Sequence, residues 1–245
     1  MDQALMKATL EVDEYHWWYR GRRRVILAEL DRLPLARGAS VLDAGCGSGR
    51  TLQELTRYGE VHGIELDSEA AELARARGHG EVRLGRLEEL PWGSDSFDLV
   101  TCLDVIEHTP DDRVTLAELR RVTKPGGFLL VTVPAYQALW SFHDEANHHY
   151  RRYGRPTLRS AARAAGWDVQ RMTSFNSLLL APAAAVRLLQ RRFGTGNGYT
   201  NDLALGPAWL NDVLERPLAL EASWLARGHT LPAGLSLLAV LRKPP

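Results

Sequence analysis

Short apolar segments alternate with amphipathic segments from residue 40 to the end of the chain. An alternation of β-prone runs with helical patterns is typical of a parallel sheet that helices cover on both faces. The pattern therefore predicts an α/β fold with a doubly wound, mostly parallel sheet. The expected strands lie at 40–44, 61–66, 81–85, 97–103, 128–133, 167–172 and 235–241.

Helical patterns flank this alternation. Residues 1–38 predict a helical segment before the first strand, and residues from about 175 to 230 predict a helical insertion before the last one. A chain of 245 residues has room for one large core and little more. We therefore expect a single domain over residues 1–245, with its core at 39–135 and a C-terminal part at 136–245.

Composition and charge argue against a nucleic-acid partner, a disulfide framework and a membrane span. Thirty basic residues match thirty acidic ones, so no global field draws the molecule to nucleic acid, and we expect no such partner. The two cysteines are too few for a disulfide framework and fit a reducing compartment. The N-terminus lacks the apolar core of a signal peptide, and the longest apolar stretch, 178–186, is too short to span a membrane. These features predict a cytoplasmic protein without a transmembrane segment.

The first expected strand leads into a loop in which Gly45, Gly47 and Gly49 alternate with other residues. Backbone without side-chain bulk, beside the first amides of a helix, lets a ligand approach closely. Glu65 ends the next strand, where a carboxylate accepts both hydroxyls of a ribose. Together they predict a nucleoside-bearing cofactor. The dinucleotide fingerprint of NAD enzymes fails, because it requires glycine or alanine where this chain has Arg50.

The segment 41–50, VLDAGCGSGR, resembles the first motif of the class I S-adenosylmethionine (SAM)-dependent methyltransferases of the methyltransferase type 11-like superfamily. The resemblance continues in order through 63–65, 90–92, 96–100, 106–108 and 124–127, and it covers roughly residues 40–135. It implies a Rossmann-like sheet of seven strands, SAM as the cofactor and transfer of its methyl group to a small acceptor. It also implies that residues 1–38 form a lid and that residues 136–245 include the acceptor side.

The resemblance assigns cofactor contacts residue by residue. It implies that the amino-acid end of SAM lies over the glycine loop, that the ribose binds Glu65 and that Leu66 flanks the adenine. Many relatives read the adenine with an acid after the third strand; Arg86 stands there in this chain, which leaves the Leu87 amide to contact the base. Arg23 is expected to reach the cofactor carboxylate. The full set of expected contacts is Asp43, Gly45, Cys46, Gly47, Gly49, Glu65, Leu66, Leu87, Glu88, Leu103 and Arg23.

Residues 104–108 follow the fourth expected strand at the edge where the crevice of such a sheet lies. Asp104, Glu107 and His108 are expected to share one face of a helical turn. A similar Glu-x-x-Glu-His arrangement occurs in ubiquinone-pathway O-methyltransferases and in small-RNA 2′-O-methyltransferases that use a divalent ion. We expect these residues to shape the loop and contact the cofactor, without a metal.

The segment 140–153, WSFHDEANHHYRRY, concentrates aromatic, histidine and arginine side chains, which is typical of a functional loop. Its pattern resembles a segment of a bacterial subgroup of these enzymes. We expect His149 or His108 to remove a proton from the acceptor, which favours O-methylation of a small metabolite, sugar or quinone-like hydroxyl. Three alternatives stay open: an N- or C-methyltransferase, a SAM-binding protein without transferase activity, and an NAD-dependent oxidoreductase.

Aromatic and basic residues near both ends of the chain leave a surface contact open. Residues 15–19 are followed by four arginines within 20–24, and we expect a lid helix there. Residues 178–192 pair an apolar run with Arg187, Arg191 and Arg192, which fits either a peripheral contact with lipid or packing on the core. The sequence gives no oligomeric state.

Overall fold

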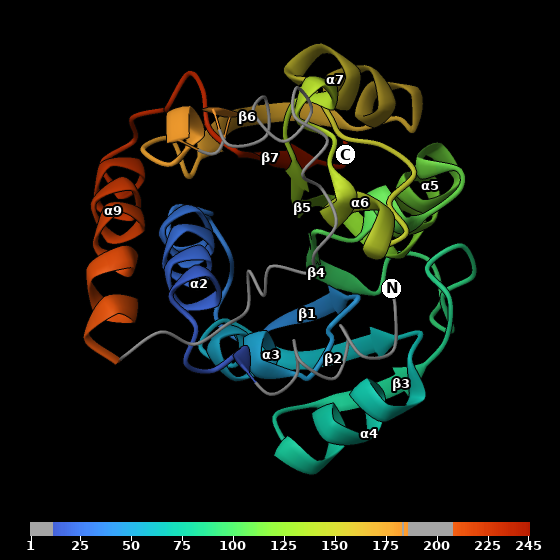
Figure 1. Ribbon diagram of the computed structural model, residues 1–245. Coiled ribbons are helices and arrows are strands. Elements are labelled where there is room, and N and C mark those ends of the chain that lie inside the picture. Colours follow the sequence, from blue (N-terminus) through green and yellow to red (C-terminus); the bar gives the residue numbers. More distant parts are fainter. Residues whose placement is uncertain (1–11, 183, 186–207) are drawn as a thin grey trace.

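The computed structural model describes residues 12–182, 184–185 and 208–245, and these form a seven-stranded sheet in the order β3-β2-β1-β4-β5-β7-β6 (Figure 1). β7 runs antiparallel to both of its neighbours, and the other neighbouring strands are parallel. This confirms the predicted Rossmann-like, mostly parallel sheet. The strands are β1 (Ala39–Ala44), β2 (Gly59–Glu65), β3 (Glu81–Leu84), β4 (Phe97–Leu103), β5 (Thr123–Pro134), β6 (Asp168–Phe175) and β7 (Ser236–Arg242).

Two helical layers cover the sheet, because the central strands are apolar on both faces. Along β1, Val41 packs into one core cluster and Leu42 into the other. The cluster around Leu42 contains residues of α5 and α7, whereas the cluster around Val41 contains residues of α2, α3, α4 and α9. The helices are α2 (Trp17–Leu30), α3 (Arg50–Leu55), α4 (Ser68–Arg77), α5 (Asp112–Val122), α6 (Phe142–Ala146), α7 (Arg155–Ala164) and α9 (Ala208–Ala226), with short 3₁₀ turns η1 (Ile106–His108) and η2 (Gln137–Leu139).

One strand boundary was predicted wrongly. The fifth strand was expected at 128–133, after Lys-Pro-Gly-Gly at 124–127, but β5 already begins at Thr123. Thr123 pairs with Phe97 of β4, and the register then shifts before Leu99 pairs with Phe128. The proline and glycines therefore lie within an irregular start of the strand, which a β-bulge accommodates.

The helical additions at the two ends of the chain meet in space. α2 and α9 lie side by side at one edge of the molecule (Figure 1). The Trp17 amide donates to Asn211 Oδ1 at 3.0 Å near the start of both helices, and Arg32 donates to the Ala226 carbonyl at 3.2 Å near their ends, so the helices run parallel. A Cβ on Gly21 would lie 2.5 Å from a Leu218 side-chain carbon, so glycine permits this close approach. Residues 186–207, with Arg187, Arg191 and Arg192, lie outside the described residues.

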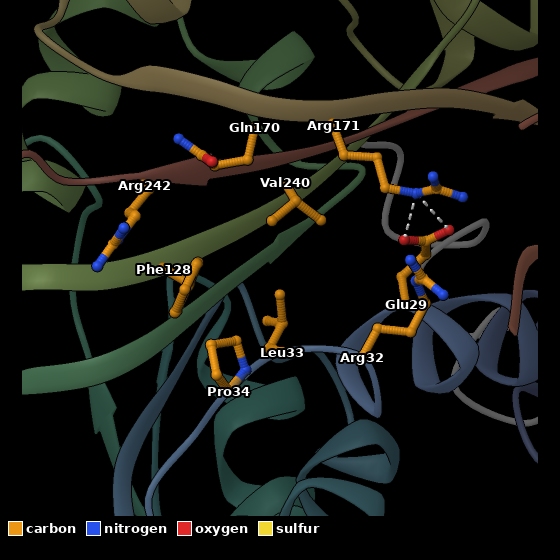
Figure 2. Close-up of a pocket in the computed structure, with 9 residues that line it drawn as sticks. All are labelled: Glu29, Arg32, Leu33, Pro34, Phe128, Gln170, Arg171, Val240 and Arg242. Carbon is orange, nitrogen blue, oxygen red and sulfur yellow. Dashed lines mark hydrogen bonds and ion pairs between the residues drawn. The ribbon is translucent and has the colours of Figure 1, made fainter. Parts of the chain in front are cut away.

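A cavity of about 290 Å³ lies between α2 and the strands β5, β6 and β7 (Figure 2). On its rim Arg171 Nε contacts both carboxylate oxygens of Glu29, at 3.1 and 2.8 Å. Phe128 and Arg242, which are paired across β5 and β7, also line it. Phe128 lies near the start of β5, whereas the glycine loop follows the end of β1, so this cavity is at the opposite edge of the sheet from the predicted cofactor site. The Arg171–Glu29 contact on its rim connects α2 to the sheet.

Within the part of the chain that the structure describes, no helix has the length and apolarity needed to cross a membrane.

Candidate active site

The glycine loop connects β1 to α3, as the sequence predicts. Gly45, Gly47 and Gly49 have φ values of 82°, 53° and 77°, a region that L-residues seldom adopt. A Cβ on Gly45 would lie 2.6 Å from a methyl carbon of Val105, so the loop needs glycine there to pack against the segment after β4. A Cβ on Gly47 would meet nothing within 4 Å. The loop thus packs tightly against the protein at Gly45 and faces open space at Gly47.

Glu65 stands at the tip of β2 with its carboxylate turned to the loop. Its Oε2 accepts from the Gly47 amide at 2.8 Å, and its Oε1 accepts from the amides of Leu66 and Asp67 at 2.8 and 3.0 Å. Three main-chain donors hold this carboxylate beside the open side of the loop. The structure therefore brings together the two features that predicted a nucleoside-bearing cofactor.

Asp43 lies beneath the loop and is almost fully buried. Its Oδ1 accepts a hydrogen bond from Thr101 Oγ1 at 2.7 Å on the neighbouring strand. Burial raises the pKa of Asp43 to about 7, although the hydrogen bond from Thr101 opposes the shift. Cys46 is buried as well, and burial raises the pKa of its thiol, so this side chain stays neutral.

The other expected cofactor contacts surround the loop at different depths. Leu66 is exposed, whereas Leu87 and Leu103 are buried and belong to the two core clusters. Arg86 lies 3.6 Å from the Glu88 carboxylate. Arg86 and Glu88 thus form an ion pair at the place where many relatives carry an acid alone.

The N-terminal segment covers the loop. Asp13 Oδ2 accepts a hydrogen bond from Ser48 Oγ within the glycine loop. Arg23 donates to the Asp13 carbonyl at 2.7 Å and to the Glu14 carbonyl at 3.5 Å, and so it holds this covering segment. Arg22 pairs with Asp104 at 2.6 Å, which ties α2 to the segment after β4.

The segment after β4 differs from the expected single helical turn. Asp104 has a φ of 57° and precedes the turn η1, and its carboxylate faces Arg22. Glu107 and His108 lie on η1, whereas Asp104 lies outside it. Glu107 is buried, its Oε2 has no hydrogen-bond partner among the described residues, and burial followed by the nearby Asp104 carboxylate raises its pKa well above the ordinary value.

Residues 141–153 fold back onto this turn. The Tyr150 amide donates to the Glu107 carbonyl at 2.8 Å, and the rings of His149 and His108 lie 4.6 Å apart, edge to face. The chain reverses at His148, which has a φ of 54°. The structure thus brings the two predicted bases, His149 and His108, into contact.

His149 is oriented by a carboxylate that the sequence analysis did not single out. Its Nδ1 lies 2.9 Å from Asp144 Oδ1, and the same oxygen accepts from Arg152 Nε at 2.7 Å. Burial alone raises the pKa of Asp144, but the hydrogen bonds from His149 and Arg152 outweigh it and hold this pKa well below the ordinary value. An ionised Asp144 can only accept a hydrogen bond, so His149 carries its proton at Nδ1 and Nε2 is the nitrogen with a free lone pair.

His108 is the less suitable base of the two. Burial, and then the neighbouring His149, lower the pKa of His108 to about 3. Its imidazole is therefore neutral at ordinary pH and a weak proton acceptor. One ligand atom each from Glu107, His108 and His149 lie within 4.8 Å of one another, and neutral imidazoles with a carboxylate are a donor set for a divalent metal.

Two parts of this arrangement escaped the sequence. Asp144 and Arg152 lie in the histidine-rich segment that predicted a site, but residues 147–152 form no regular helix or strand whose periodicity could have paired them with His149. Asp13 and Ser48 are 35 residues apart, and only the fold brings them together.

Comparison with known proteins gives consistent results. A family model described as "Methyltransferase domain" matches residues 42–131. An uncharacterized 37.1 kDa protein in transposon TN4556 of Streptomyces fradiae is 38% identical over 223 residues, which are 81% of this chain and 63% of that protein. The ubiquinone biosynthesis O-methyltransferase of Hahella chejuensis is 32% identical over 166 residues, which are 58% of this chain and 69% of that protein. The chain thus spans less than two thirds of the length of the Streptomyces relative.

The fold comparison agrees. A chain from the complex between the Haloferax volcanii Trm112 methyltransferase activator and the putative methyltransferase superposes with a TM-score of 0.66 at 24% identity, over 99% of this chain and 95% of that one. The likeness shows a common fold. Together with the family model and the relatives, it shows that the chain belongs to the class I SAM-dependent methyltransferases, a family that binds SAM.

Proposed function

We propose that this chain transfers the methyl group of SAM to a hydroxyl of a small acceptor, with His149 as the general base. Methyl transfer from a sulfonium is an in-line displacement, so the protein aligns the acceptor and removes its proton. The observation that carries the proposal is the chain of contacts from Arg152 through Asp144 to His149 beside the cofactor edge of the sheet. It leaves His149 Nε2 as the proton acceptor and favours O-methylation over N- or C-methylation.

Several features support the other parts of the proposal. The open side of the loop at Gly47 and the held carboxylate of Glu65 suit the amino-acid end and the ribose of SAM. Arg23 is proposed to contact the cofactor carboxylate, and the Leu87 amide with Glu88 to read the adenine. Both cysteines are free, which fits a cytoplasmic location.

The test is His149→Asn with His148→Asn as the matched control. His148 is exposed and has a left-handed backbone, which asparagine tolerates. We expect His149→Asn to lower kcat by about 10²- to 10⁴-fold with unchanged SAM affinity, and His148→Asn to leave both unchanged. Turnover is measured with a pool of hydroxyl-bearing acceptors and SAM affinity by calorimetry. A His149→Asn enzyme with full turnover contradicts the proposed role, and SAM binding without any product indicates a binding protein.

A metal-assisted transfer at the same site is the second candidate. It is favoured by the buried Glu107 Oε2, which has no partner among the described residues and lies near His108 and His149. If a divalent ion activates the acceptor hydroxyl there, dialysis against EDTA abolishes turnover and Mn²⁺ restores it. Full activity after chelation contradicts the metal-assisted mechanism and favours His149 as a general base without a metal.

A further inference from the structure

The outer face of α9 carries exposed apolar side chains that do not pack against the core. We define this face by Trp209, Val213, Arg216, Leu220, Trp224 and Arg227, which recur at intervals of three and four residues and therefore share one side of a helix. The four apolar members are 65%, 43%, 68% and 44% exposed, in chain order. Figure 1 shows α9 at the edge of the molecule with α2 on its inner side.

The inner face of α9 accounts for its attachment to the fold. Leu218 and Leu225 are fully buried against the core cluster that contains α2. Glu215 is buried and pairs with Arg20 and Arg24 of α2. Glu221 accepts from the amides of Asn176 and Ser177 at 2.6 and 2.8 Å. The inner face thus holds these two carboxylates together with apolar residues, whereas both tryptophans lie outside, and contiguous exposed apolar residues of this kind mark an interaction surface.

The charges and shape of the outer face indicate its partner. Arg216 and Arg227 are exposed on it, while the nearby Asp212 pairs with Arg20 at 3.0 Å, so the face is cationic. Trp209 and Trp224 are fifteen positions apart, or about 22 Å along the axis, which suits an extended flat surface rather than a small ligand. Two tryptophans with arginine between and beyond them are typical of helices that lie in the interface of an anionic bilayer.

A second copy of the chain fits this face less well. A symmetric antiparallel pairing of two α9 helices about their middle places Arg216 of each copy beside the other, and like charges in contact oppose association. Four apolar side chains on one helix also offer far less than the roughly 800 Å² per partner of a stable interface.

We propose that the outer face of α9 docks the protein on anionic phospholipid membranes, with the helix parallel to the surface. The start of α9 lies beside the start of α2, the end of α2 from which Arg22 reaches Asp104 at the cofactor edge. Docking therefore holds the cofactor edge near the membrane. The proposal does not depend on methyl transfer.

The test uses flotation of the full chain with vesicles of phosphatidylcholine alone or mixed with phosphatidylglycerol. We expect binding only to the anionic vesicles, with about tenfold or greater loss of partitioning in the double variant Trp209→Ser/Trp224→Ser. Arg216→Gln/Arg227→Gln should weaken binding and remove its dependence on salt. Val114→Ser, on the exposed side of α5, is the matched control and should bind like the unaltered protein.

A second readout keeps the outcome unambiguous. Vesicles with brominated acyl chains should quench the tryptophan fluorescence of the unaltered protein and not that of Trp209→Ser/Trp224→Ser. SAM affinity, measured by calorimetry, should be the same in all variants. Absent flotation, flotation that survives the tryptophan substitutions, or a dimer in light scattering that those substitutions dissociate would each overturn the proposal.

Discussion

At the proposed cofactor edge, residues of the same type differ in their hydrogen bonds and burial. Glu65 is held by three main-chain amides beside the open part of the glycine loop, whereas Glu60, on the same strand, has a side chain that is 79% exposed. Asp43 is buried beneath the loop with one hydrogen bond from Thr101. Both carboxylates are therefore predicted to respond to conservative substitution in distinct ways.

Glu65→Gln should weaken SAM binding by about 10- to 100-fold, because hydrogen bonds to a charged acceptor contribute about 1.5–3 kcal/mol and the amide keeps only one acceptor oxygen. The control Glu60→Gln should leave affinity unchanged. Calorimetry with SAM checks both. Equal affinity of the two variants would remove the ribose-binding role from Glu65.

Asp43→Asn should change how stability depends on pH. The pKa of Asp43 is about 7 in the folded protein and ordinarily 3.8, so the folded state keeps a proton that the unfolded chain loses as pH rises through this interval. This group therefore lowers the free energy of unfolding between about pH 4 and pH 7, by about 4 kcal/mol. Asparagine does not titrate, so the variant should gain stability relative to the unaltered protein as pH rises. Urea unfolding at pH 5 and pH 8 measures the difference, and a constant difference contradicts it.

Elements of this fold are joined by a few buried polar contacts in addition to apolar packing. Arg171 of β6 contacts both oxygens of Glu29 on α2, and it also donates to the carbonyls of Gly228 and His229 after α9 (Figure 2 shows the Glu29 contact). Glu29 is 1% exposed. One guanidinium thus joins α2, β6 and the end of α9.

Glu29→Ala should lower the free energy of unfolding by about 3 kcal/mol, because removing one partner leaves a largely buried guanidinium without its counter-charge. Glu72→Ala on α4, where the side chain is exposed, is the matched control and should change it by about 0.5 kcal/mol or less. Urea unfolding measures both. A loss for Glu29→Ala below about 1 kcal/mol would show that apolar packing alone holds α2.

The whole molecule places the residues proposed to bind the cofactor and the acceptor at one edge of one sheet. The glycine loop follows β1, Glu65 ends β2, and η1 follows β4, so three parallel strands bring their carboxyl ends to the same crevice. The covering segment before α2 contacts the loop through Asp13. A ligand in this crevice therefore contacts several elements at once and is expected to stabilise the fold as a unit.

The demethylated cofactor, S-adenosylhomocysteine, should raise Tm by about 5–10 °C at about 100 times its Kd, because ligand linkage then contributes about 2.7 kcal/mol. NAD at the same concentration should give no shift, since the dinucleotide fingerprint fails at Arg50. Scanning fluorimetry compares the two. A larger shift with NAD would favour the oxidoreductase alternative.

The elements that were predictable depend on local pattern. Alternating apolar segments gave all seven strands, because central strands of a doubly wound sheet are apolar on both faces. Local pattern placed the start of the fifth strand at 128, but the pairing of Thr123 with Phe97 extends β5 back to Thr123. It also failed at Asp104, where helical spacing predicted one turn over 104–108, but Asp104 has a φ of 57° and lies before η1.

The sequence by itself determined the sheet, the glycine loop and the carboxylate at the tip of β2, because periodicity, glycine content and strand ends are local properties of the chain. Only the tertiary structure decided that Asp144 orients His149, that His149 meets His108 and Glu107, and that the tryptophans of α9 face outward. These arrangements depend on which segments pack together. That packing is set by the burial of apolar faces over the whole molecule, which no short window of the sequence contains.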